Sequence, residues 1–374
     1  MTAVSTTRPE YDNLLEDVEK NRDAVAGERA IKEETTKYLP PLASMTTSVY
    51  QNENGSQQII SGSTLTAEGK SSYRKYISLA YFYGATGRTV DGLTGLIFSK
   101  KPMKDLNSTV EYLNDNINGR GDSLYKQSQK VTEEAFITPR SGLLVDFPNV
   151  NQQVSIAVAE ASNLRPKILH YPFESIINWH YDVVDNQQKL TLLVLKECVD
   201  KLVNRFQIEK ATQYRVLEII EGVYHQSVIG ADGNDIIPAM PVLVNGNSSN
   251  EIPFYFIEVG VGDKSVINDL VDANLNHYRF FADYAAKEHA SAFPVFWETG
   301  VVGDDSNIVI GPGAKWTNQQ TDASYGILQT ESDGGSMRTY LLDMEQRMAA
   351  LGAEMLKPRI SGAESAEAKT LDQV

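Results

Sequence analysis

Residues 266–288 read VINDLVDANLNHYRFFADYAAKE, and this stretch predicts the element around which the rest of the chain is arranged. Its apolar side chains recur at steps of three and four residues, which is the spacing of one face of an α-helix. At ~1.5 Å per residue, such a helix is about 35 Å long. Asp263 is a suitable N-cap, since a carboxylate accepts hydrogen bonds from the first backbone N–H groups of a helix. The apolar face consists of Ile267, Leu270, Val271, Tyr278, Phe281, Ala282 and Ala285.

A short β segment is predicted directly after this helix. PVFWE at 294–298 and IVI at 308–310 read as strands, and GDD at 303–305 reads as the turn between them. The apolar side chains of so small a segment exceed what it can bury alone, so we expect them at an interface with another subunit. The alternative is that Trp297 folds back onto the preceding helix. The candidate interface residues are Phe293, Val295, Phe296, Trp297, Ile308 and Ile310.

A second helix is predicted after the turn text DGG at 333–335, and Pro358 ends it. Its apolar residues alternate at steps of four and three, as in the seam of a coiled coil. Methionine adapts to irregular surfaces, so this seam is a candidate for packing against a neighbouring subunit. The spacing by itself favours an ordinary packing seam within one chain. The seam residues are Met337, Leu341, Met344, Met348, Leu351 and Met355.

The opposite side of the first helix is polar. Six of its side chains recur every three or four residues and therefore stack along one face. Periodicity cannot decide whether such a face lines an internal channel or lies on a solvated outer surface. The six residues are Asp269, Asp272, Asn276, Arg279, Asp283 and Lys287.

The chain before this region predicts an α+β domain. Helical spacing occurs at 7–27, 73–80, 90–97, 108–116 and 123–136, and residues 43–69 read as a long surface loop. From Gly142 the period changes to that of strands, and turn texts separate several of them, which indicates a largely antiparallel sheet. The predicted strands lie at 143–146, 168–171, 176–184, 190–198, 214–220, 223–229 and 254–258.

Composition narrows the function classes. The 374 residues carry a net charge of −15, which argues against non-specific binding of a DNA duplex over the whole surface. We expect no membrane span and no secretory signal, because there is no apolar run of ~20 residues and MTAVS does not begin a signal peptide. The single Cys198 lies in an apolar strand-like run and is expected to be buried packing. The five histidines are scattered and no phosphate-binding loop is present, so we expect no metal, no cofactor and no enzymatic activity.

Short stretches along nearly the whole chain resemble bacteriophage portal proteins, in particular a short portal-like family catalogued as a domain of unknown function. Each stretch is brief, but their order carries the resemblance. They are RDAVAGERA at 22–30, YLP at 38–40, YRKY at 73–76, GRTVDGLTGLIF at 87–98, GLLVDFP at 142–148, RPK at 165–167, IINW at 176–179, YRVL at 214–217, DMEQRM at 343–348 and LGA at 351–353.

The resemblance implies a phage portal fold. It divides the chain into an α/β wing at 1–262, a stem helix at 263–292, a small β clip at 293–320, and a channel loop, long helix and start of a crown at 321–374. Portal proteins of this kind usually continue with further helices, so most of a crown is expected beyond Val374. The channel loop that would face DNA is expected at Gln329, Thr330, Glu331, Ser332 and Asp333.

The resemblance also implies a function and partners. Portal proteins form a homo-oligomeric ring, usually a dodecamer, at one vertex of the virion capsid, and they assemble in the host cytoplasm. Double-stranded DNA passes through the ring without sequence recognition during packaging and ejection. The expected partners are the terminase, which supplies the motor, a head–tail adaptor, and the major capsid or scaffolding protein. The alternative function is a head–tail adaptor or another capsid-associated structural ring protein, and an enzyme is the least favoured class.

Overall fold

The computed structural model describes residues 3–53, 56–148, 158, 162, 164–184, 186–244, 247–259, 263–292, 295–299, 324–328 and 334–352. These residues form a mixed helix and sheet structure, so the α+β class predicted from the sequence is confirmed. The chain divides into two compact units. Unit 1 contains the described parts of Met1–Gly27, Gly84–Asp272 and Leu351–Met355, and unit 2 those of Glu28–Tyr83 and Ala273–Ala350. Residues 28–83, expected in one domain with the rest of 1–262, thus lie in unit 2.

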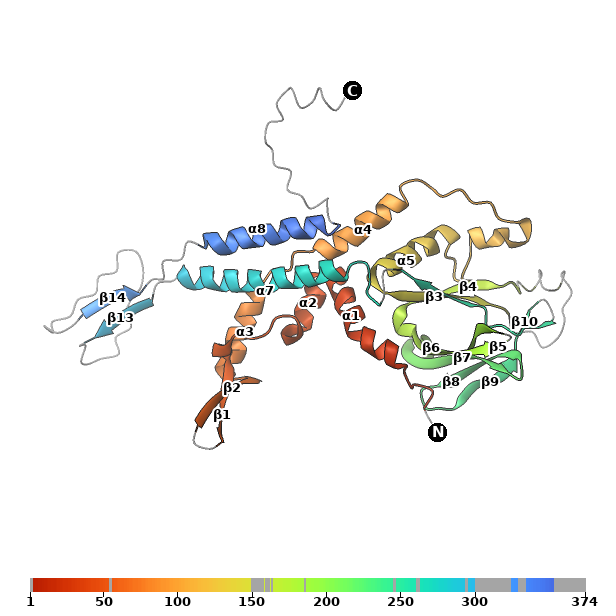
Figure 1. Cartoon of the computed structure of the whole chain (residues 1–374), viewed down its shortest axis with the longest axis horizontal. Coiled ribbons are helices and arrows are strands. Elements are labelled where there is room, and N and C mark those ends of the chain that lie inside the picture. The colour runs from red at the N-terminus through yellow and green to blue at the C-terminus, as the bar shows by residue number, and fades with distance from the viewer. Residues whose placement is uncertain are drawn as a thin grey trace, which may run out of the picture. The chain divides into compact units, whose positions relative to one another are not determined.

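The described residues of unit 1 form two larger antiparallel sheets and one small two-stranded pair (Figure 1). One has the strand order β12-β3-β4, and the other is a meander with the order β5-β6-β7-β8-β9. Apolar side chains from both sheets, including Leu144, Leu193, Leu217 and Phe254, form the hydrophobic core. The strands are β3 Arg140–Asp146, β4 Lys167–Tyr171, β5 Ile176–Val184, β6 Gln187–Asn204, β7 Gln207–Ile220, β8 Val223–Gly230, β9 Asp235–Pro241 and β12 Phe254–Glu258, with a small β10 Leu243–Val244 and β11 Asn247–Ser248 pair. Every strand predicted before residue 259 falls within one of them, although β6 and β7 extend much further than expected.

The helices of unit 1 include α1 Pro9–Ala26, α4 Ala85–Ile97 and α5 Leu124–Ile137. A short 3₁₀ helix, Ser108–Asn114, precedes α5. Gly87 precedes the helical spacing predicted at 90–97, but it lies inside α4, which begins earlier, at Ala85. A Cβ atom at this position would meet the Val25 carbonyl oxygen at 2.8 Å, so only glycine allows α4 to approach α1 this closely.

Arg22 of α1 makes two ion pairs, each with two hydrogen bonds. Its guanidinium donates to both carboxylate oxygens of Glu134 at 2.7 and 2.8 Å and to both of Glu174 at 2.6 and 2.8 Å. The Glu134 side chain is 7% exposed and also accepts from the Thr138 hydroxyl and the Phe173 N–H. These three charged residues, the Arg22 cluster, join α1, α5 and the turn before β5.

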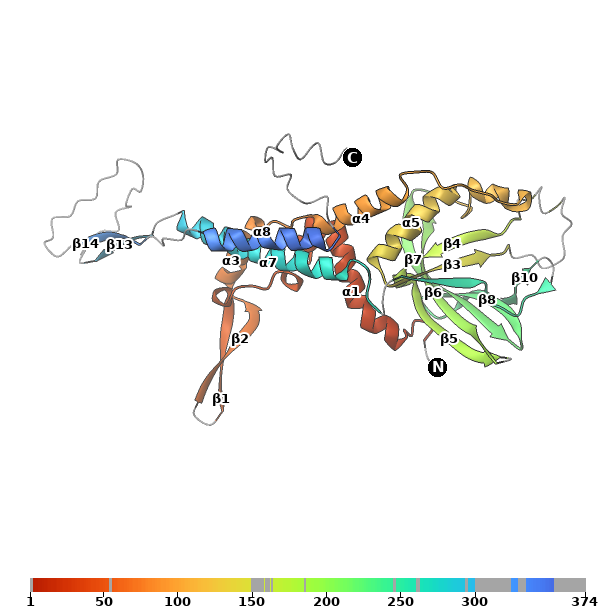
Figure 2. The ribbon, with the colours of Figure 1, turned by 45° about the horizontal axis from the view of Figure 1, so that its top comes forward.

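Unit 2 is built around two long helices, α7 Asn268–Ser291 and α8 Gly335–Ala350, of which the first turn of α7 falls in unit 1. In the views of Figure 1 and Figure 2 the two helices run side by side. The segment 28–83 packs against α7 through aromatic contacts, such as Phe82 on Tyr278 with ring centroids 5.9 Å apart. Its other elements are α2 Glu28–Glu33, two 3₁₀ turns at Thr35–Lys37 and Ala43–Met45, and the elements described next.

Residues 43–69 do not form the predicted surface loop. They contain a hairpin of β1 Thr46–Glu53 and β2 Ser56–Leu65, followed by α3 Ala67–Leu79. The prediction was wrong because the stretch has few apolar residues to indicate a strand, whereas its backbone pairs antiparallel, with Val49 opposite Ile60. Thr66 then caps α3 by accepting a hydrogen bond from the Gly69 N–H at 2.8 Å.

Candidate functional site

The antiparallel α7–α8 pair is the structural centre of the candidate site. Phe280 contacts Tyr340 with ring centroids 4.5 Å apart and the rings tilted by 43°, and one turn earlier on α7 the His277 Nε2 lies 3.5 Å from a Glu345 carboxylate oxygen. Residue numbers thus rise along α7 as they fall along α8, which shows that the helices are antiparallel. Gly334 sits at the start of α8 with φ of 52°, and a Cβ there would meet the Glu288 carboxylate at 2.3 Å. Glycine therefore lets α8 begin against the last turns of α7.

The middle of the predicted methionine seam is buried within the chain. Leu341 and Met344 are each 6% exposed and Met348 is fully buried. Met337 is half-buried, Leu351 is 49% exposed, and Met355 lies outside the described residues. The buried part matches an ordinary packing seam, and a role against a neighbouring subunit stays a prediction.

Among the described residues, the first strand of the β segment after α7 pairs with a strand that the sequence analysis did not predict. β13 Val295–Thr299 pairs antiparallel with β14 Ser324–Leu328. The expected partner strand with Ile308 and Ile310, and the expected interface residue Phe293, lie outside the described residues. Sequence analysis missed β14 because a glycine in the middle of SYGIL is typical of a break rather than of a strand.

The β13–β14 pairing explains that glycine. Trp297 lies opposite Gly326, and a Cβ atom on Gly326 would meet the indole ring at 2.5 Å. The indole therefore lies across the glycine, as aromatic side chains do when they cover a glycine in a sheet. Trp297 remains 44% exposed, which leaves much of its surface free for a partner.

Two residues of the polar face of α7 are bound within unit 2. Arg279 Nε donates to the Tyr38 carbonyl at 2.9 Å, and Asp283 accepts a hydrogen bond from the Tyr76 hydroxyl at 2.5 Å. Burial, followed by this hydrogen bond to Asp283, raises the pKa of Tyr76, so the phenol stays protonated and donates. These contacts hold the segment 28–83 on α7.

The other four residues of the polar face are exposed, as Asp283 is. Asp272 forms an ion pair with Lys20 at 2.9 Å, and both residues belong to unit 1. Asp269, Asn276 and Lys287 are exposed. The face predicted to line a channel thus combines residues engaged inside the chain with residues open to solvent. The expected channel loop, Gln329, Thr330, Glu331, Ser332 and Asp333, lies outside the described residues.

The buried side of α7 is unexpectedly polar. Asn274, His277 and Tyr278 are buried, and atoms of all three side chains lack a hydrogen-bond partner among the described residues. Burial lowers the pKa of His277 to about 4, because the charged imidazolium is disfavoured away from water. Sequence analysis placed Tyr278 on the apolar face of this helix but assigned no role in it to Asn274 or His277.

A pH dependence of stability follows from His277. Its folded-state pKa lies below the ordinary value of 6.5, so its contribution is complete above about pH 6.5 and is lost as the pH falls toward 4. We expect the free energy of unfolding of unit 2 to drop by about 2–3 kcal/mol from this residue between about pH 7.5 and 4.5. Denaturant titrations of wild type and His277→Phe across this range measure the drop as the difference between the two curves. Parallel pH profiles for the two proteins would contradict the assignment, since both retain the facing Glu345.

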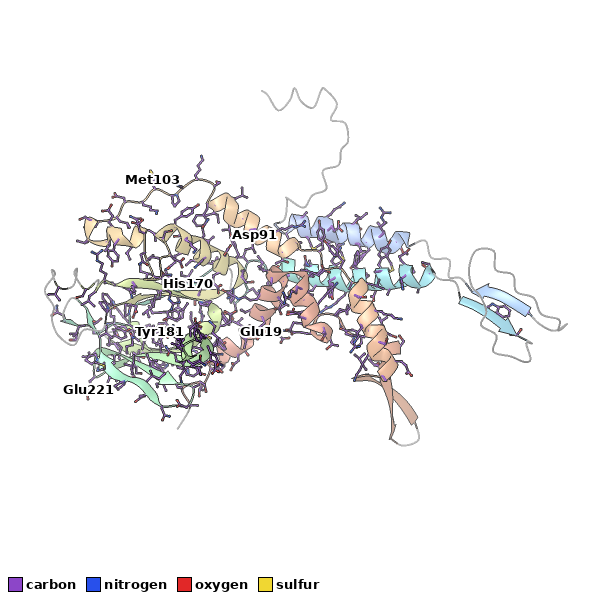
Figure 3. The ribbon with its side chains drawn as sticks, turned by 180° about the vertical axis from the view of Figure 1, so that it is seen from behind. Glu19, Asp91, Met103, His170, Tyr181 and Glu221 are labelled. Carbon is purple, nitrogen blue, oxygen red and sulfur yellow. The ribbon has the colours of Figure 1, made fainter. Side chains whose placement is uncertain are left out.

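Unit 1 contains a cavity of about 610 Å³. Its walls are formed by β4, by α5 with the loop before it, and by parts of β6 and β7. His170 of β4, labelled in Figure 3, lies on its wall. Arg215 of β7 donates to Glu197 at 2.8 Å and to Asp146 at 3.3 Å, and the Tyr171 hydroxyl donates to Glu197 at 2.7 Å. These groups satisfy one another, so the network ties the five-stranded sheet to the three-stranded one.

No cluster of three or more His, Cys, Asp or Glu side chains suited to hold a metal ion occurs among the described residues. None of the described helices combines the length and apolar character needed to cross a lipid bilayer.

Comparison with known proteins adds one similarity. The model of a family described as Domain of unknown function (DUF4055) matches residues 267–374. The matched stretch begins at the start of α7 and includes β13, β14 and α8. No curated protein matches the chain. The similarity therefore falls on the helix–hairpin–helix region that holds most of the candidate site.

Proposed function

We propose that this chain is the subunit of a bacteriophage portal ring. In this proposal α7 is the stem helix, β13 and β14 belong to the clip, and α8 is the long helix that follows the channel loop. The observation that carries the proposal is the antiparallel α7–α8 pair, interrupted by a hairpin with the exposed Trp297. The ordered resemblance to portal sequences and the family similarity over the same helix–hairpin–helix region support it.

The proposed ring sits at one vertex of the capsid and passes double-stranded DNA during packaging and ejection. The clip docks the terminase first and the head–tail adaptor later, and the wing contacts the major capsid or scaffolding protein. A head–tail adaptor ring remains the alternative. Native mass spectrometry of the purified chain and of assembled particles tests the proposal: a mass of about twelve chains supports it, and a monomer in both samples refutes it.

The mainly acidic polar face of α7 leads to a prediction about DNA transport. A wall with few cations releases few counterions from DNA, so it holds a passing duplex loosely. Lysines at Asp269 and Asn276, which are exposed, would add phosphate contacts without disturbing the Tyr76–Asp283 hydrogen bond. We expect D269K/N276K to form normal rings but to package DNA at least several-fold more slowly, with the defect relieved by added salt.

The matched control is D343K/Q346K on the exposed side of α8, which makes the same charge change away from the polar face of α7. Packaging rates are compared in an assay with purified terminase. Equal rates for D269K/N276K, the control and wild type would place the polar face outside the channel.

A further inference from the structure

Strands β6 and β7 continue well beyond the sheet to which they belong. The pairing of β5 with β6 ends at Leu195, and the pairing of β8 with β7 begins at Gln213. Beyond these points, residues 198–212 pair only with one another among the described strands. We call this two-stranded extension the β6–β7 ribbon. All residues from 200 to 210 are exposed, so both faces of the ribbon lack cover in the single chain.

An isolated two-stranded ribbon is marginally stable in water, and its two outer edges present unpaired backbone groups. Apolar side chains gather at its end: Leu202 is 66% exposed, Val203 50%, Phe206 86% and Ile208 62%. Such a group of exposed apolar residues on free strand edges indicates an interaction surface. Cys198, expected to be buried, is exposed for the same reason, because it lies beyond the covered part of β6.

The charges of the ribbon are arranged in opposite pairs on both faces. Asp200 of β6 lies opposite Lys210 of β7, with an ion pair of 2.5 Å, and Lys201 lies opposite Glu209. Neighbouring residues of a strand point to opposite faces, so one pair lies on each face. On one face β6 therefore carries the acid and β7 the base, and on the other face the order is reversed.

This arrangement identifies the partner as a second copy of the chain. If the free edge of β7 pairs antiparallel with the free edge of β6 in the next copy, Lys210 meets the next Asp200 and Glu209 meets the next Lys201. Both faces then gain opposite charges at once, and Ile208 lies beside the next Leu202. Pairing two identical edges about a two-fold axis at these positions would instead set Lys210 against Lys210.

We infer that the β6–β7 ribbons of adjacent subunits join edge to edge into a continuous intersubunit β-sheet. Because the two edges differ, the contact is head to tail and closes only in a ring. The inference rests on the proposed portal ring and adds the specific surface of unit 1 through which subunits recognise one another.

A charge swap tests the inference. The variant D200K/K201E/E209K/K210E reverses the sign of all four charges. The two pairs within its ribbon therefore keep opposite charges. The proposed contacts between two copies of this variant also keep opposite charges. A junction between a swapped and a wild-type copy has like charges on both faces. When the two forms are co-expressed with different tags, native mass spectrometry should show roughly fivefold to tenfold fewer mixed neighbours than random assortment gives. The control R29E/E33R swaps an exposed ion pair of α2 and should mix at random with wild type.

A second measurement does not depend on the charge swap. With Cys198 replaced by serine, chains carrying only L202C are mixed with chains carrying only I208C, so a disulfide can form only between copies. We expect cross-linked dimers in the mixture and few with either chain alone. Rings that mix at random and give no cross-link overturn the ribbon inference but leave the ring intact, whereas a chain that never forms rings overturns both proposals.

Discussion

Replacing Arg22 by methionine is expected to lower the free energy of unfolding of unit 1 by about 3–5 kcal/mol. Methionine fills much of the space of the arginine stem but removes all four hydrogen bonds to Glu134 and Glu174. Glu134 is 7% exposed and would be left as a buried carboxylate without its counter-ion. Breaking one partner of a buried pair costs more than the pair contributes, because the remaining charge is not solvated.

Denaturant unfolding followed by circular dichroism measures this loss. Arg29→Met is the matched control, since Arg29 pairs with Glu33 on the surface with a side chain that is 90% exposed, and its removal should leave the unfolding midpoint almost unchanged. Adding Glu134→Gln to Arg22→Met should recover part of the loss by removing the stranded charge. If Arg22→Met unfolds like Arg29→Met, the Arg22 cluster does not stabilise unit 1.

Replacing Trp297 by alanine is expected to weaken ring assembly or adaptor docking by about 2–4 kcal/mol, which is the range for an aromatic anchor at the centre of an interface. The indole lies across Gly326 and keeps 44% of its surface exposed, so a partner can cover what the hairpin does not. This result is expected only if the hairpin is the docking clip of the proposed ring.

Gly326→Ala helps to decide whether Trp297 binds a partner or only stabilises the hairpin. The added Cβ would displace the indole without removing it, because the ring atoms lie 2.5 Å from that position. Sedimentation and binding of purified adaptor are then compared for both variants. If Trp297→Ala assembles and binds the adaptor like wild type, and only the stability of the chain changes, the tryptophan serves the hairpin alone.

The sequence predicted those strands whose apolar and polar residues alternate, and it missed strands that depend on contacts with distant residues. Strand β12 was predicted with its observed bounds, Phe254–Glu258, because alternating apolar residues fit a half-buried strand. β14 was missed because Gly326 is explained only by the indole of Trp297 on the partner strand. The extended ends of β6 and β7 were also missed, since their exposed residues lack the alternation that burial of one face imposes.

In the candidate site, too, the features within one helix were predicted and the contacts between distant segments were not. The spacing of α7 identified its polar face, but it could not show that Asp283 is bound by Tyr76. That contact joins residues 207 positions apart, and the Arg22 contacts span 112 and 152 positions. Such pairs depend on the tertiary fold, which periodicity within one segment does not encode. The ring itself and the partners of the hairpin stay predictions.

Cryo-electron microscopy of assembled particles tests the central proposal most directly. The proposed function predicts a closed ring of this chain at a single capsid vertex, with the α7 helices around an axial channel and Asp269 and Asn276 facing it. The β13–β14 hairpin would lie at the end where the terminase or adaptor docks. Particles in which the chain forms no ring, or a ring whose α7 polar faces point to the outside, would contradict this account.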